Sequence, residues 1–153
     1  MFIFFFQYLY NWVYKTNKLF YKKIKMRNKL LQIWGVLFCG SAVILGAFGA
    51  HLLSDMLSND ALQSFEVGVR YQFFHGLALL FLSLTSNLQK FTNRAARLFI
   101  VGTLLFSISI YLLSMSTMYG DTGLPAILGP VTPIGGLMLI LGWISLLVGF
   151  ART

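Results

Sequence analysis

Charged residues are scarce in this sequence, and acids are the scarcest of all. Only 10% of the 153 residues are charged, with four acids against twelve lysines and arginines. Soluble domains carry about 25% charged residues, so this composition excludes an ordinary soluble protein. The single cysteine, Cys39, has no partner in the chain. A disulfide framework and a cysteine metal site are therefore excluded as well.

Apolar residues take the place of the missing charge. They make up 58% of the chain, and the mean hydropathy is +0.76. A membrane-crossing helix needs about 20 apolar residues, so the chain has room for roughly four of them. We therefore predict an all-α integral membrane protein. Its one domain, residues 26–153, is a four-helix transmembrane bundle with spans at about 30–50, 67–88, 98–118 and 133–150.

Residues 1–25 do not fit this bundle. Their aromatic, apolar part is about 13 residues long, too short to cross a bilayer. Basic residues follow it and no Ala-x-Ala site is present, so a cleaved signal peptide is not expected. Two interpretations remain: an aromatic and basic helix that lies on the membrane surface, or an upstream extension that is not translated, with Met26 as the true start. The second is favoured because Met26 is followed by two basic residues and a full-length span.

Small residues recur at helical spacing within the predicted spans. In the first span Gly35, Cys39, Ala42, Gly46 and Gly49 follow one another at intervals of four, three, four and three. Lipid gives helices no hydrophobic reason to associate, so a stripe of small side chains brings two backbones close enough for dispersion contact. We predict that six glycines pack helix against helix: Gly35, Gly46, Gly49, Gly135, Gly142 and Gly149.

Polar residues and prolines mark the connections between the spans. The run Asp60-Ala-Leu-Gln63 resembles a capping box. It is predicted to start a short amphipathic segment before the second span, with Leu62 and Phe65 on one face. Residues 119–130 are rich in glycine and proline and are predicted to be a loop. Thr132 before Pro133 is typical of a helix start with threonine as the N-cap.

The charges are distributed unevenly between the two sides of the predicted bundle. Seven of the twelve basic residues lie between Lys15 and Lys29, and the loop after the second span adds Lys90, Arg94 and Arg97. The acids fall on the other side: Asp55, Asp60, Glu66 and Asp121. Basic residues in short loops stay in the cytoplasm, so both termini are predicted to be cytoplasmic. The expected partner is the lipid bilayer, with other membrane proteins or further copies of the chain as additional candidates, and nucleic acid is not expected.

Polar residues gather at the end of the first span and in the second. They form a candidate cluster of His51, Glu66, Arg70, Gln72 and His75. Glu66 and Arg70 are four residues apart, the spacing at which a carboxylate and a guanidinium meet on a helix. His75 lies about 7 Å beyond Arg70 along the helix, so the cluster is expected near the outer end of the bundle. In the favoured interpretation the charged pair neutralises itself, while Gln72 and His75 hydrogen-bond neighbouring helices.

Other uses of the cluster remain open. The histidines with Glu66 or Asp55 could hold a transition metal, or the two histidines a haem iron, although no His-x-x-x-His spacing supports either. Ionisable residues in a span are also candidates for a proton or small-solute path, but 98–118 and 133–150 contain no charge. No catalytic constellation is visible, so we predict neither an enzyme nor a cofactor. The favoured function is a non-catalytic structural or partner-binding membrane component.

Three motifs resemble a known family. They are Gly46-Ala-Phe-Gly-Ala-His51, the stretch Val67–Leu80 around Arg70-Tyr-Gln-Phe-Phe-His75, and Thr132-Pro-Ile-Gly-Gly136 followed by Gly142-Trp143. With them the chain, from about Met26 to its end, is similar to the YgdD-like family of small bacterial inner-membrane proteins classed as a domain of unknown function. The resemblance implies four transmembrane helices, residence in the bacterial plasma (inner) membrane and no assigned activity. Gly76 stands where family members usually have alanine.

Overall fold

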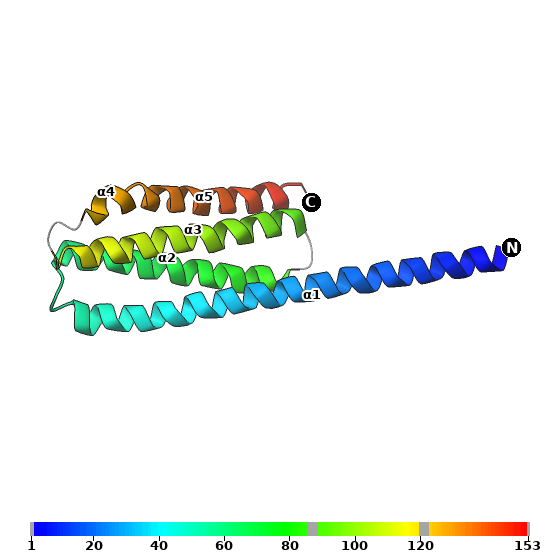
Figure 1. The fold of residues 1–153 in the computed structure, drawn as a ribbon, viewed down its shortest axis with the longest axis horizontal. Coiled ribbons are helices and arrows are strands. Elements are labelled where there is room, and N and C mark those ends of the chain that lie inside the picture. Colours follow the sequence, from blue (N-terminus) through cyan, green and yellow to red (C-terminus); the bar gives the residue numbers. More distant parts are fainter. Residues whose placement is uncertain (1, 86–88, 120–122, 153) are drawn as a thin grey trace.

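The described part of the protein is built from helices that run antiparallel to one another (Figure 1). The computed structural model describes residues 2–85, 89–119 and 123–152. The elements are α1 (Phe2–Phe48), a π-helix η1 (Gly49–Leu53), α2 (Asn59–Leu84), α3 (Gln89–Ser116), the short α4 (Leu124–Leu128) and α5 (Val131–Phe150). Four stretches are long and apolar enough to cross a membrane: Asn28–Leu53, Asn59–Leu84, Lys90–Ser116 and Leu124–Phe150. The predicted all-α, four-helix membrane architecture is therefore confirmed.

Helices that follow one another along the chain also pack together. α1 packs on α2, α2 on α3, and α3 on α5. One apolar cluster centres on Leu79 and Phe99, in the body of the bundle. A second surrounds Phe65 and Tyr111, whose ring centroids lie 4.8 Å apart. This second cluster anchors the first turns of α2 against α3.

Glycines set the distance between the helices. A Cβ atom on Gly35 would lie 2.7 Å from Leu80 Cγ of α2, and one on Gly135 would lie 2.5 Å from the backbone nitrogen of Phe106 in α3. Real Cβ atoms do not approach so closely, so a larger residue would push these helices apart. The other four glycines that the sequence singled out also face a neighbouring helix, at Val69, Phe65, Phe99 and Phe91: Gly46, Gly49, Gly142 and Gly149.

α2 begins earlier than the sequence indicated. Its N-cap is Ser58, whose hydroxyl accepts a hydrogen bond from the Ala61 backbone N–H at 3.3 Å, so the prediction that Asp60 opens the helix is wrong. The predicted amphipathic segment and the second span form one continuous helix, with Ala61 and Phe65 buried on its inner face. The helix ends at Leu84, and residues 86–88, predicted to belong to the span, lie outside the described residues.

Two predicted loops contain helix. α3 begins at Gln89, so Lys90, Arg94 and Arg97 stand on its first turns. The reason is that Ala95 and Ala96 are buried, and packing on this face continues the helix past the apolar stretch. In the predicted loop 119–130, residues Leu124–Leu128 form α4.

The last span also starts differently from the prediction. α5 begins at Val131 with Pro130 as its N-cap, so the prediction that Thr132 caps the helix is wrong. The Thr132 hydroxyl lies 2.7 Å from the Ser109 hydroxyl of α3 instead. A bond between helices has thus taken the place of a local cap.

α1 is longer than a membrane span requires. Its 47 residues would measure about 70 Å, more than twice the roughly 30 Å hydrocarbon thickness. Figure 1 shows its N-terminal part continuing past the end of the bundle. No glycine or proline precedes Gly35, so nothing in the sequence ends the helix earlier. Both interpretations of residues 1–25 stay predictions.

Candidate functional site

Gln72 joins three helices through its side-chain amide. Its Nε2 donates to the Phe38 carbonyl at 3.1 Å and to the Ser41 hydroxyl at 2.7 Å, both on α1. Its Oε1 accepts from the Tyr111 hydroxyl of α3 at 3.0 Å. The side chain is only 7% exposed. Both amide hydrogens and the amide oxygen of this α2 residue are therefore satisfied inside the bundle.

His75 lies one turn further along α2 and reaches the fourth helix. Its Nδ1 is 2.8 Å from the Tyr71 carbonyl, and its Nε2 accepts from the Trp143 indole N–H of α5 at 3.2 Å. Since a carbonyl only accepts, Nδ1 carries the proton, and the neutral Nδ1–H tautomer satisfies both ring nitrogens. The ring is 4% exposed and meets the Phe99 ring edge-on at 5.1 Å. The imidazole is thus enclosed by aromatic side chains.

The structure separates the other three candidate residues from this buried pair. His51 is exposed on η1, and Glu66 and Arg70 are exposed on α2. Arg70 Nε donates to the backbone carbonyl of Glu66 at 3.4 Å. Within the described ranges no ion pair joins the two side chains. Of the predicted cluster, only Gln72 and His75 are buried with hydrogen bonds to other helices. The two sets of bonds share no partner and are together called the buried network.

The network also lies deeper than expected. Because α2 starts at Asn59 and has 26 residues, Gln72 and His75 stand near its middle, not at the outer end of the bundle. Their partners Ser41, Tyr111 and Trp143 were not identified from the sequence. The only sequence signal was the resemblance motif Gly142-Trp143, since a lone serine or tyrosine in a span does not show which helix it faces.

Residues that could hold a metal are dispersed. Within 2–85, 89–119 and 123–152, no three His, Cys, Asp or Glu side chains come close enough to share an ion. The Cys39 Sγ is 3.7 Å from the Phe73 carbonyl, to which it donates a weak hydrogen bond. A metal or haem at His75 would have to displace Trp143 or Tyr71, because both ring nitrogens are engaged.

Comparison with known proteins places the chain among small membrane proteins. A family described as "Protein of unknown function (DUF423)" matches residues 45–136. A UPF0382 membrane protein of Staphylococcus aureus (strain bovine RF122 / ET3-1) is 39% identical over 121 residues, covering 78% of this chain and 93% of that protein. One from Haemophilus influenzae is 37% identical, covering 84% and 98%. The Bacillus subtilis protein is 36% identical, covering 81% and 98%. No solved structure is significantly similar to the chain.

The matched region includes the whole candidate cluster, from His51 to His75. The comparisons support the expectation of a membrane family of unknown function, and they give it the names DUF423 and UPF0382 in place of the YgdD-like name. The relatives are called membrane proteins, in agreement with the four apolar helices. This chain belongs to the DUF423 family of UPF0382 membrane proteins.

Proposed function

We propose that this protein is a non-catalytic structural or partner-binding component of the bacterial plasma membrane, with both termini in the cytoplasm. The observation that carries the proposal is the complete hydrogen bonding of the Gln72 and His75 side chains. Every nitrogen and oxygen of these two side chains has a partner within the bundle. A satisfied network in lipid holds helices together and leaves no group available for a ligand or a proton.

The placement of charge supports the same proposal. Every charged side chain whose exposure is described lies on the surface of the molecule. The alternative, a proton-coupled or small-solute path, would use Glu66, Arg70 and His75 in sequence. The first two are exposed, whereas His75 is buried with both nitrogens engaged. A structural role therefore fits the described polar groups better than a path does.

The test separates stability from transport. Gln72→Leu and His75→Ala should lower the free energy of unfolding in mild detergent by about 1 to 2 kcal/mol, the upper part of the range for hydrogen bonds between membrane helices. Gln63→Leu is the matched control, because Gln63 is exposed on the same helix. In proteoliposomes, the wild-type protein should carry no pH-dependent proton flux above empty vesicles.

The alternative predicts the reverse pattern. A wild-type flux that Arg70→Ala or His75→Ala abolishes, without loss of thermal stability, would establish conduction and overturn the structural role. Equal stability of Gln72→Leu and Gln63→Leu would also contradict it, since the buried network would then contribute nothing.

A further inference from the structure

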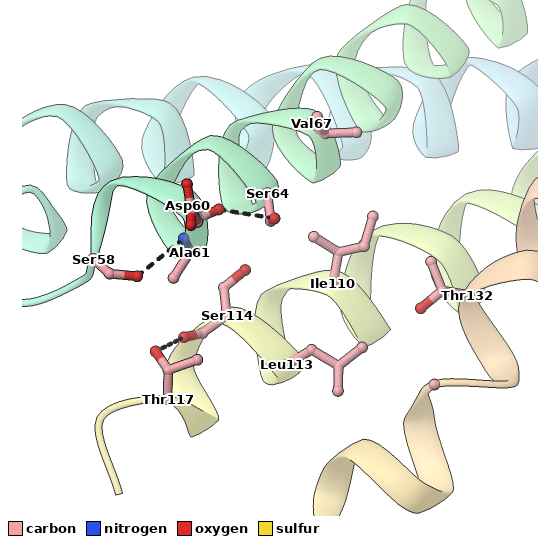
Figure 2. A pocket seen from close by; sticks show the side chains of 11 residues that line it. Ser58, Asp60, Ala61, Ser64, Val67, Ile110, Leu113, Ser114, Thr117 and Thr132 are labelled. Atoms are coloured by element: carbon pink, nitrogen blue, oxygen red, sulfur yellow. Dashed lines mark hydrogen bonds between the residues drawn. The ribbon is translucent and has the colours of Figure 1, made fainter. Parts of the chain in front are cut away.

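A groove of about 580 Å³ opens at the end of the bundle where α2 begins. α2 and α5 both pack on α3, which forms the floor between them (Figure 2). About two turns beyond Val67 along α2, the hydrogen bond between Trp143 and His75 joins α5 to α2.

Polar and apolar side chains share the lining. The polar ones carry a carboxylate and five hydroxyls: Ser58, Asp60, Ser64, Ser114, Thr117 and Thr132. Val67, Ile110 and Leu113 form the apolar walls. Val67 stands seven residues beyond Asp60, so it lies about 10 Å deeper along α2. An amphiphile with its polar head at Asp60 and its hydrocarbon tail against Val67 and Ile110 matches this lining.

The charge around the opening selects a cation. Asp60 is exposed and is the only charged residue among the described residues that line the groove. Asp55 and Glu66 add two exposed carboxylates at the same end of the molecule. The described lysine or arginine closest to Asp60 in the sequence is Arg70, ten residues away. A phosphate or carboxylate group alone would meet a carboxylate with no basic lining residue. An ammonium group would meet a charge partner and hydroxyl acceptors.

One hydroxyl in the groove has no partner among the described residues. Ser114 is 3% exposed, and its Oγ is buried without a hydrogen bond. Figure 2 shows this hydroxyl directed across the groove toward Asp60 and Ala61 at the start of α2. The hydroxyls of Ser58 and Thr117, by contrast, bond to backbone groups. An unsatisfied buried hydroxyl costs stability, and an N–H donor in the groove would supply what it lacks.

We propose that this groove binds a membrane lipid whose headgroup carries a primary ammonium, such as phosphatidylethanolamine. The ammonium pairs with the Asp60 carboxylate and donates to the Ser114 hydroxyl, and an acyl chain follows the walls at Val67, Ile110 and Leu113. This lipid site goes beyond the structural role proposed above. The two can fail separately, because neither Asp60 nor Ser114 belongs to the Gln72 and His75 network.

The test measures lipid retention by native mass spectrometry of the full-length protein in detergent. The probes are phosphatidylethanolamine, phosphatidylglycerol and free ethanolamine. Wild type should retain phosphatidylethanolamine in preference to phosphatidylglycerol. Asp60→Asn should weaken retention by about ten-fold, the change expected when a hydrogen bond to a charged group is lost. Asp55→Asn is the matched control, because it removes an equally exposed carboxylate outside the groove.

Asp60 lies in the first turn of α2, so a second variant is needed to separate lipid binding from an effect on the start of this helix. Val67→Phe fills the groove while leaving Asp60 in place, and it should also reduce phosphatidylethanolamine binding. Equal retention of both lipids by wild type, or an Asp60→Asn protein that binds like Asp55→Asn, would overturn the proposal. Displacement of the lipid by millimolar free ethanolamine would overturn it too, since the occupant would then be a soluble amine.

Discussion

Thr103 carries a buried hydroxyl for which the described part of the chain provides no partner. The residue is 1% exposed on α3, and its Oγ1 makes no hydrogen bond to any described residue. Thr103→Val removes this hydroxyl at nearly constant shape. Because an unsatisfied buried polar group costs about 1 to 3 kcal/mol, we expect the variant to unfold at a higher temperature in mild detergent. Thr132→Val, which removes a hydroxyl bonded to Ser109, should lower that temperature. A loss of stability in both variants would mean that Thr103 has a partner.

Gln72 and His75 illustrate how far single residues can be interpreted from sequence. A glutamine and a histidine inside an apolar span predict hydrogen bonds to other helices, since lipid offers none. Their partners depend on the rotation of each helix about its axis. Ser41 and Tyr111 stand 31 and 39 residues from Gln72, and only the packed bundle brings them within reach. The residue types of Gln72 and His75 thus predicted that each makes a hydrogen bond to another helix. Which residue accepts or donates that bond depends on how the helices pack.

Hydropathy predicted that the helices exist but not where they end. The apolar stretches mark the thickness of the bilayer, and a helix continues beyond it wherever one face still packs. Ala61 and Phe65 extend α2 backward, and Ala95 and Ala96 do the same for α3. The charged residues on these extra turns face outward, so they resemble loop residues in the sequence. Burial on one face, which the sequence pattern shows only weakly, sets the true boundaries.

The contact between α3 and α5 depends on a pair of glycines. A Cβ atom on Gly135 would come within 2.5 Å of the Phe106 nitrogen and 2.9 Å of the Gly102 carbonyl oxygen. Both are backbone atoms, which cannot rotate away. We expect Gly135→Ala to destabilise the bundle by about 1 to 3 kcal/mol, as overpacking does, measured by thermal unfolding in detergent.

Gly40 provides the control on another helix. A Cβ atom there would meet nothing within 4 Å, so Gly40→Ala should leave stability unchanged or raise it slightly through helix propensity. If the two alanine variants were equally stable, the close approach of α3 and α5 would not contribute to folding.

The molecule as a whole has one basic end and one acidic end. Figure 1 shows the end of α5, the start of α3 and the N-terminal part of α1 toward one end, and the turn between η1 and α2 at the other. The first three carry Arg152, the basic residues of α3 and the lysines of α1, and the turn and the start of α2 carry Asp55 and Asp60. The exposed lysines of α1 recur every three or four residues: Lys15, Lys18, Lys22, Lys25 and Lys29. A basic stripe on the helix that leaves the bundle is suited to the cytoplasmic face, where anionic lipids attract it. With both termini in the cytoplasm, as proposed, the groove would open toward the opposite face.

This orientation predicts which positions are accessible from outside the cell. In a Cys39→Ser background, Ser54→Cys reports on the turn between η1 and α2, and Ala151→Cys reports on the end of α5; both positions are exposed. A membrane-impermeant maleimide should label the first in intact cells and the second only after permeabilisation. Labelling of both from the same side would contradict the proposed four crossings. A reversed pattern would keep the bundle but place the termini outside, and the groove would then take its ammonium lipid from the cytoplasmic leaflet.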